Sequence, residues 1–269
     1  MATYKTRALV VKKTKLKEAD LILTLLAENG EQVRAVAKGA RKPGTTFSAR
    51  LEIFSVVDAM LYKGKNLDTI TEVRSVDTNE ASRRDLEHLS YGAVISEFVE
   101  KVALEGEENP VLFPLTCAAL QSVGRVEADA LPFVIAGYLL KAISYLGYRP
   151  SIGLCTVCGA SKEGYAQEMA EFADEVDLDA EGVFSISAGG WVCPLCSGFG
   201  ELEADDIVSE PVVAWVKALI GLKFPQIEEM FSASEDAGAL AGELLSFCDK
   251  WIYAHLETHM RSLAYLSRL

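Results

Sequence analysis

The first 76 residues alternate between hydrophobic and polar positions with a period of two, which is typical of half-buried β-strands. Turn residues divide this pattern into segments, and the Asn29-Gly30 pair is a strong hairpin signal. The predicted strands cover residues 6–11, 20–26, 31–38, 53–62 and 67–73. Five short strands within about 75 residues predict a small β-barrel of the OB type.

After Asp77 the hydrophobic positions recur with helical spacing. The predicted helices cover residues 79–105, 110–124, 129–147, 209–221 and 234 to the C-terminus. The sequence therefore predicts an α+β multidomain protein, with an OB-fold domain at 1–77 and a helical domain at 78–269. The apolar run 131–147 contains Lys141 and is too short to cross a bilayer, so we expect a buried helix. With no secretory signal at the start, we expect a cytoplasmic protein.

The predicted strand at 31–38 has two different faces. One face carries small apolar residues, Val33, Ala35 and Ala37, which suit the interior of a small barrel. The other face carries the cations Arg34 and Lys38. A solvated edge strand would also carry lysine, so the strand alone leaves both interpretations open.

Charge is unevenly distributed along the chain. The formal net charge is −13, but residues 1–76 hold 14 Lys and Arg against 8 Asp and Glu, which gives +6. The remaining residues carry −19. A basic module followed by an acidic one favours polyanion binding by the first module.

The cations of the first module fall in three segments. In an OB barrel, nucleic acid lies across strands two and three, between the loop joining strands one and two and the loop joining strands four and five. The candidate DNA-binding residues are Lys12, Lys13, Lys15 and Lys17 in the first loop, Arg34, Lys38, Arg41 and Lys42 on and after strand three, and Lys63 and Lys65 in the last loop. Convergence of these segments on one face predicts a nucleic-acid interface.

Aromatic side chains near these cations could stack on bases. Phe54 and Tyr62 share a predicted strand face with Val56 and Met60, so we expect both to pack in the core. Phe47 lies in a predicted loop and is the better candidate for stacking.

Two C-x-x-C pairs predict a metal site. The pairs are Cys155 with Cys158 and Cys193 with Cys196, separated by 34 residues that contain a strand candidate and a Gly-rich turn. Four thiolates complete a tetrahedral site for one structural zinc ion and leave no open catalytic position. Disulfides do not suit a cytoplasmic chain, and no thioredoxin-like context supports a redox dithiol. We therefore expect a four-cysteine zinc ribbon at about 151–200.

No catalytic residue is assigned. His255 and His259 are four residues apart on a predicted helix but lack a third ligand, and His88 stands alone. The sequence contains no phosphate-binding loop and no nucleophile elbow. We expect Cys117 and Cys248 to be core thiols.

A set of short motifs is spread along almost the whole chain. In the first domain the residues are Lys17, Glu18, Asp20, 24–26, Gly30, 35–43, Leu51, Phe54, Tyr62, Gly64 and Leu67. In the second they are 146–148, Pro150, Cys155, Cys158, Gly159, Gly189, Gly190, Cys193, Cys196 and 261–263. In this order the motifs resemble the RecO family of bacterial DNA-repair and recombination mediators. The run 35–43 is fairly specific, whereas the four cysteines alone are not.

The resemblance implies an OB-fold DNA-binding domain and a helical domain with a zinc site. Members of this family bind single- and double-stranded DNA, anneal complementary strands and act with RecR to load RecA on DNA coated by single-strand-binding protein. They also recognise the acidic tail of that protein. Such a tail would need a local basic patch in the acidic half of the chain, for which the candidates are Lys217, Lys223, Lys250 and Arg261. The acidic insertion at 163–181 is longer than the family pattern and is assigned no role.

Two other classes of function remain open from the residues alone. One is a ligase- or nuclease-like enzyme that uses an OB barrel and a zinc ribbon, although no nucleotide-attachment lysine motif or carboxylate metal cluster is found. The other is an interaction scaffold in transcription or translation. Strand annealing without a nucleotide requirement would separate a mediator from both.

Overall fold

The structure is a computed structural model that describes residues 2–42, 44–45, 47–168, 181–198, 206–234 and 237–266. The chain forms two compact units, which are described separately. The first comprises Met1–Tyr138 and Met260–Leu269, and the second Leu139–His259. The domain boundary expected at residue 77 stays a prediction.

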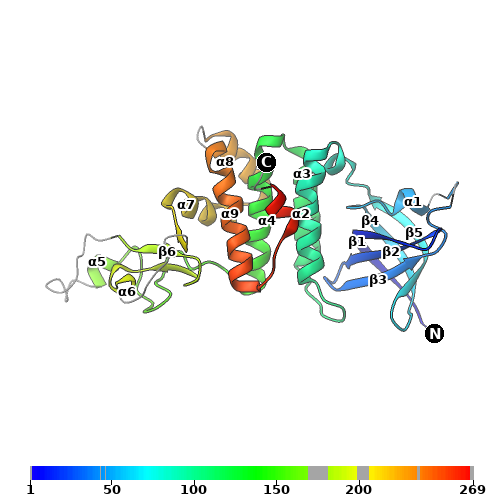
Figure 1. The fold of residues 1–269 in the computed structure, drawn as a ribbon, viewed down its shortest axis with the longest axis horizontal. Helices are drawn as coiled ribbons and strands as arrows, with labels where there is room; N and C mark the ends of the chain where they lie inside the picture. Colours follow the sequence, from blue (N-terminus) through cyan, green and yellow to red (C-terminus); the bar gives the residue numbers. More distant parts are fainter. Residues whose placement is uncertain are drawn as a thin grey trace. The chain divides into compact units, whose positions relative to one another are not determined.

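The first unit begins with a closed five-stranded barrel, as predicted (Figure 1). Its strands are β1 (Thr3–Leu16), β2 (Asp20–Ala27), β3 (Gln32–Ala37), β4 (Val56–Tyr62) and β5 (Asp68–Asp77). The order around the barrel is β1-β2-β3-β5-β4. Neighbouring strands are antiparallel except for the short parallel pairing of β3 with β5, at Ala35–Asp68 and Val36–Thr69, which helps to close the barrel.

The barrel interior is built from small and branched apolar side chains. Ala8, Ala35, Ala59, Leu23 and Leu61 are all buried in one cluster. Alanines on neighbouring strands leave room for the leucines between them, which is how a small barrel fills its interior. The alanine face predicted for β3 is therefore the inner face.

Two barrel segments differ from the sequence prediction. β1 continues to Leu16, because residues 12–16 pair with β2 and lengthen the hairpin. β4 begins at Val56 rather than at residue 53, and a short helix, α1 (Phe47–Arg50), precedes it. Phe54 adopts a positive φ of 70° just before β4, and this turn ends the strand pattern earlier than the apolar sequence suggests.

Helices complete the first unit. They are η1 (Glu80–Arg83), α2 (Leu86–Val102), α3 (Leu112–Arg125), η2 (Ala128–Ala130) and α10 (Arg261–Leu266). The Asp85 side chain caps α2 by accepting the backbone N–H of His88 at 2.9 Å. Gly92 of α2 lies against the Phe54 ring, because a Cβ there would come within 2.6 Å of that ring.

Helix α4 (Leu131–Tyr145) passes from the first unit into the second. By length and composition alone, the window Ala128–Tyr145 could cross a membrane, but 72% of it is buried inside the protein. This burial is typical of a core helix and agrees with the buried helix expected here.

The second unit contains a small sheet and a helical part (Figure 1). Its elements are α5 (Tyr165–Glu168), β6 (Val183–Ser185), β7 (Gly190–Val192), α6 (Pro194–Ser197), β8 (Ile207–Val208), α7 (Glu210–Gly221), α8 (Phe224–Ser232) and α9 (Ala237–Leu256). The long last helix of the prediction is two helices, α9 and α10, because Glu257 has a positive φ of 50°. Helix α8 was not predicted, and most of the acidic insertion at 163–181 lies outside the described residues.

Candidate nucleic-acid interface and metal centre

The outer face of β3 carries the cations expected there. Val33, Ala35 and Ala37 are buried, whereas Arg34 and Lys38 are exposed. Both cations therefore reach solvent from a strand whose other side is packed in the barrel.

Three lysines expected in the first loop lie on β1 instead, which corrects the prediction. Opposite residues of antiparallel strands point to the same face of the sheet. The pairs are Lys12 with Thr24, Lys13 with Leu23 and Lys15 with Leu21. Lys12 therefore belongs to the outer face of the sheet. Lys13 and Lys15 lie on the same side of the sheet as Leu23 and Leu21, whose side chains point into the barrel. Of the four lysines, only Lys17 lies in the turn between β1 and β2.

Several predicted DNA contacts already have partners within the chain. Lys12 pairs with Glu100 at 2.6 Å and Lys13 with Glu52 at 2.8 Å. These carboxylates compete with phosphate for the two ammonium groups.

Arg41 fastens the turn between β1 and β2. Its guanidinium donates to the carbonyl oxygens of Lys17 at 3.3 Å and Glu18 at 3.1 Å, and its backbone N–H donates to Ala19 O at 2.9 Å. Asp20 completes the tie by accepting the Gly39 N–H at 2.7 Å. The assignment of Arg41 to DNA stays a prediction, and the structure adds that this residue holds the turn that carries Lys17.

The β4–β5 turn is held by a nearly buried carboxylate. Asp68 accepts the Tyr4 hydroxyl and the Gly64 N–H, the latter at 2.9 Å, and its other contact is Lys63 at 3.5 Å. Burial and the neighbouring Asp68 raise the pKa of Tyr4, so the tyrosine stays a hydrogen-bond donor. Sequence reasoning missed the role of Asp68, although this acid follows Lys63 and Lys65 closely in the sequence.

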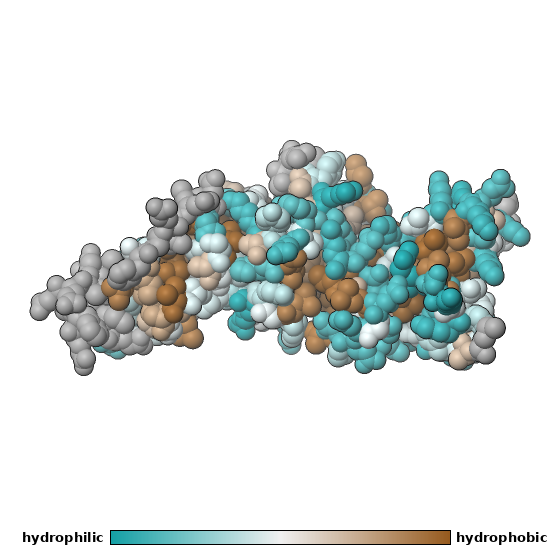
Figure 2. Space-filling view, turned by 60° about the horizontal axis from the view of Figure 1, so that its bottom comes forward, coloured by the Kyte–Doolittle hydropathy of each residue, from teal (hydrophilic) through white to brown (hydrophobic). Residues whose placement is uncertain are grey.

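The remaining candidate cations make no ion pair with any residue that the structure describes. They are Lys15, Lys17, Arg34, Lys38, Lys42 and Lys65. The barrel surface seen in Figure 2 is mostly hydrophilic, with hydrophobic side chains between the polar ones. The positive charge available to a polyanion on this module comes from the six cations named above.

The aromatic predictions need correction. Phe47 opens α1 and packs against the barrel core, so it is not a free stacking residue. Phe54 is fully buried, as expected, but against α2 rather than inside the barrel. Tyr62 and Met60 are only half-buried, because Val57, Ala59 and Leu61 are the inward-facing positions of β4.

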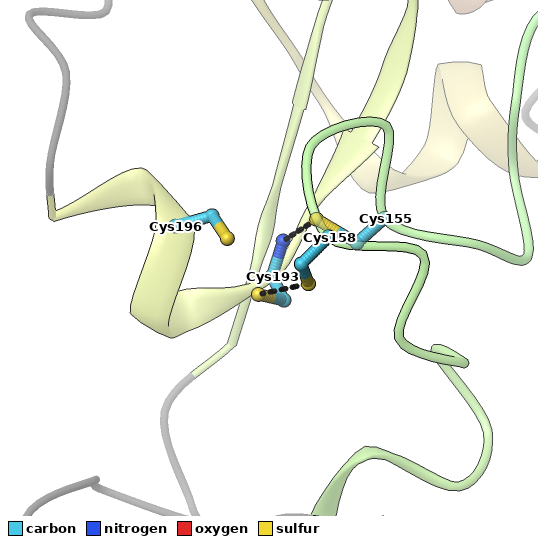
Figure 3. Close-up of side chains that lie close together, drawn as sticks. All are labelled: Cys155, Cys158, Cys193 and Cys196. Carbon is cyan, nitrogen blue, oxygen red and sulfur yellow. Dashed lines mark hydrogen bonds between the residues drawn. The ribbon is translucent and has the colours of Figure 1, made fainter.

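The four predicted metal ligands come together. Figure 3 shows Cys155 and Cys158 on one loop, with Cys193 just before α6 and Cys196 within it. All four Sγ atoms lie within 4.8 Å of one another, and Cys158 Sγ is 3.8 Å from Cys193 Sγ. Two C-x-x-C turns facing each other provide the sulfur-only ligand set that favours zinc.

Backbone N–H groups already favour a thiolate in this cluster. Burial raises the pKa of Cys155, but N–H groups of Cys193, Cys158 and Val157 outweigh it and lower the pKa to about 6. The N–H of Cys193 lies 3.4 Å from Cys155 Sγ. Burial raises the pKa of Cys193 and Cys196, so the full ligand set would need a cation to hold four thiolates together.

Comparison with known proteins identifies the relatives of this architecture. The family model described as "Recombination protein O N terminal" matches residues 1–79, and "Recombination protein O C terminal" matches residues 83–264. The chain belongs to the RecO family. It is 31% identical over 201 residues to the DNA repair protein RecO of Symbiobacterium thermophilum, a similarity that covers 75% of this chain and 74% of that protein.

Membership of the RecO family assigns the chain to DNA repair and recombination and to DNA binding. This confirms the resemblance found in the sequence motifs. The barrel is the OB-type element of this family member, and the cysteine cluster is its candidate metal site.

The other residues considered for chemistry lie apart from the cysteine cluster. His255 Nε2 lies 3.0 Å from Ile186 O, and its ring packs on Trp251 with centroids 4.3 Å apart. His259 stacks on Tyr253. In the part of the chain that the structure describes, the four cysteines are the only group of three or more potential metal ligands of this kind. Cys248 is buried as expected, whereas Cys117 is only half-buried.

Proposed function

We propose that this protein is a non-enzymatic recombination mediator that holds DNA on its barrel. It binds single- and double-stranded DNA, anneals complementary strands and, with RecR, promotes loading of RecA on DNA coated by single-strand-binding protein, whose acidic tail it recognises. The supporting observation is the set of cations around β3 and the two barrel loops that make no ion pair with any residue in the described part of the chain: Lys15, Lys17, Arg34, Lys38, Lys42 and Lys65. The partner proteins come from the family resemblance, and we place the protein in the cytoplasm, at the nucleoid.

The proposed binding mode is contact with phosphates rather than with base edges. Exposed lysine and arginine side chains neutralise the nucleic-acid backbone and release counterions, so binding is largely independent of sequence. Annealing requires two polyanions to approach each other, and a cationic surface reduces their repulsion. Neither step needs a catalytic group.

A triple variant tests the barrel face. Replacing Arg34, Lys38 and Lys42 with alanine removes three exposed cations, none of which holds a neighbouring loop as Arg41 does. Each lost phosphate contact flattens the slope of log K against log salt by about 0.7 for single strands, so we expect a change of about 2 and roughly a hundredfold weaker binding at about 0.1 M salt. Fluorescence titration of labelled DNA at several salt concentrations measures both.

The matched control removes the same charge from the second unit. Arg149, Lys217 and Lys223 are exposed, and their replacement with alanine should leave DNA affinity and the salt slope near those of the parent. Annealing of complementary strands, measured without nucleotide, should fall only in the barrel variant. Equal behaviour of both triple variants would mean that DNA binds elsewhere.

We also propose that the four cysteines bind one zinc ion with a structural role. The residues that would hold it are Cys155, Cys158, Cys193 and Cys196, and their chemistry fits because thiolates are preferred zinc ligands. Bound zinc would cross-link the two cysteine turns. With four protein ligands it would have no position left for substrate, which agrees with a mediator rather than with a ligase or nuclease.

A further inference from the structure

The outer face of β2 becomes more buried toward its hairpin end. Ile22 is half-exposed, but Thr24 is 7% exposed and Leu26 is 0% exposed. These residues alternate with the leucines of the barrel interior, so their side chains point outward. Part of the chain must therefore cover the outer face at this end.

The end of α2 and the loop that follows it contact this hairpin end. The Gln32 side-chain amide donates to Glu100 O at 3.1 Å and to Ala103 O at 2.9 Å, and its backbone N–H donates to Leu104 O at 3.1 Å. All of these contacts lie within the first unit. They place the end of α2 on the β2–β3 hairpin, across part of the face that OB folds use for nucleic acid.

Two further hydrogen bonds fasten the loop to the turn of the hairpin. Asn29 Nδ2 donates to Glu108 Oε1 at 3.0 Å, and the Gly106 N–H donates to Glu31 Oε1 at 3.0 Å. Gly30 leaves no space above it, because a Cβ there would lie 1.8 Å from Asn109 O. The loop is therefore a fixed part of this surface.

The covering segment is strongly acidic. Its carboxylates, which we call the acidic border, are Glu100, Glu105, Glu107 and Glu108. A hollow of about 260 Å³ is lined by the acids Glu105, Glu31 and Asp68 together with Arg34, Lys63 and Lys65. One member of the border, Glu105, thus lies at the same hollow as three of the candidate cations.

Glu100, another member of the acidic border, forms an ion pair with Lys12. Its carboxylate lies 2.6 Å from Lys12 Nζ, and Lys12 stands in the same cross-strand row as Thr24 and Arg34. Carboxylate and phosphate oxygens make the same charge-assisted hydrogen bond to an ammonium group. Glu100 occupies a place at Lys12 that a DNA phosphate would otherwise take.

We propose that the acidic border closes one end of the DNA-binding face. The ion pair with Glu100 keeps Lys12 from contacting DNA, and the exposed carboxylates of the loop repel the phosphate backbone of the DNA. DNA is thereby confined to the part of the face beyond this border, with Arg34 at the boundary and Lys38 and Lys42 on the open side. This inference rests on the proposed function, and it adds a boundary to the DNA path that the charge of the barrel alone does not define.

A change of one charge tests the role of Glu100. Glu100→Gln keeps the shape of the side chain but frees Lys12, so one more phosphate can be contacted. We expect DNA affinity to rise about fivefold at about 0.1 M salt and the salt slope to steepen by about 0.7 for single strands. Glu87→Gln is the matched control, because Glu87 is an exposed residue in the first turn of the same helix.

A second pair of variants tests the ion pair between Lys12 and Glu100 by changing the lysine. Lys12→Ala should have little effect in the parent but should lower affinity about fivefold in the Glu100→Gln background, since only there does Lys12 meet DNA. Lys38→Ala should lower affinity by a similar factor in both backgrounds. The triple variant Glu105→Gln, Glu107→Gln and Glu108→Gln should enlarge the number of nucleotides occluded per protein.

Failure of this inference differs from failure of the proposed function. If Glu100→Gln matches Glu87→Gln, or if Lys12→Ala weakens the parent as much as Lys38→Ala does, the border has no part in DNA binding. If the Arg34, Lys38 and Lys42 triple variant also binds like the parent, the barrel face itself is not the DNA site. Thermal unfolding of each variant checks that its fold is unchanged.

Discussion

The barrel and the cysteine ribbon are both small β structures, but different forces hold them. We define the cysteine ribbon as β6, β7 and β8 with the two cysteine turns. The barrel strands are 6 to 14 residues long, close on themselves and enclose an apolar cluster. The strands of the ribbon are two or three residues long. Phe184 of β6 and Trp191 of β7 are buried, but a sheet this small has little interior of its own.

The difference shows how much structure each hydrophobic pattern can support. Strands gain stability when they bury one face along their length, and the barrel does so all the way around. A module of a few dozen residues cannot bury enough surface and needs a metal or disulfides. We therefore expect that the barrel folds on its apolar interior and that the ribbon depends on metal.

The largest expected effect is loss of the ribbon when one ligand is removed. Cys193→Ser leaves three thiolates, and because the binding energy of structural zinc, about 10–16 kcal/mol in small peptides, is also folding energy, the ribbon should unfold. All three tryptophans, Trp191, Trp215 and Trp251, lie in the second unit. Their fluorescence should shift to the red, and metal analysis should find less than one zinc per chain.

The control for this variant is Cys117→Ser, which makes the same chemical change outside the cluster. It should keep both the metal and the fluorescence spectrum. A ribbon that keeps its spectrum after complete removal of metal would show that apolar packing alone can hold it, and the contrast with the barrel would disappear.

A smaller effect is expected from a cavity in the barrel. Leu23 is fully buried at the centre of β2, and Leu23→Ala should cost about 2–5 kcal/mol because the closed sheet cannot collapse around the lost atoms. Urea unfolding followed by far-UV circular dichroism measures the loss, and zinc content should stay unchanged. Leu86→Ala, at a residue that is 76% exposed, should change stability by no more than about 0.5 kcal/mol.

The sequence predicted the features that depend on local pattern. The five strands, the inward face of β3 and the cysteine cluster follow from alternation and from ligand spacing. The lysines of β1 were misplaced because residues 12–16 pair with β2 although they have no apolar alternation of their own.

The cover over the outer face of β2 could not be predicted in the same way. Leu26 reads as part of a strand, and nothing in the local pattern tells which distant helix packs on it. Gln32 and Glu100 are 68 residues apart in sequence and become neighbours only through the fold. For the same reason the sequence did not show that the Arg41 guanidinium holds a turn.

Helix α10 provides an intermediate case between an apolar core and a metal site. It has six residues, and a helix of this length is not stable by itself. Leu263 and Leu266 are buried, and one carboxylate, Glu97 of α2, accepts hydrogen bonds at its N-terminus. The donors are the Arg261 N–H at 2.9 Å, the Ser262 N–H at 2.7 Å and the Ser262 hydroxyl.

The smallest expected effect comes from Glu97→Gln, at about 1.5–3 kcal/mol, because hydrogen bonds to a charged acceptor lose strength when it is neutral. Burial raises the pKa of Glu97, but the hydrogen bonds from Ser262 and Arg261 outweigh it and hold the folded pKa below its ordinary value. A carboxyl with a lowered folded pKa adds stability that is fully present above its unfolded pKa and is lost as the pH falls through the folded pKa.

Urea unfolding between neutral and acidic pH should therefore show that the parent loses this stability as the pH falls. Glu97→Gln should be less stable than the parent at neutral pH and should show no such loss. Glu87→Gln on the same helix should follow the parent, and identical pH profiles for the parent and Glu97→Gln would show that the buried leucines alone hold α10, as apolar side chains hold the barrel.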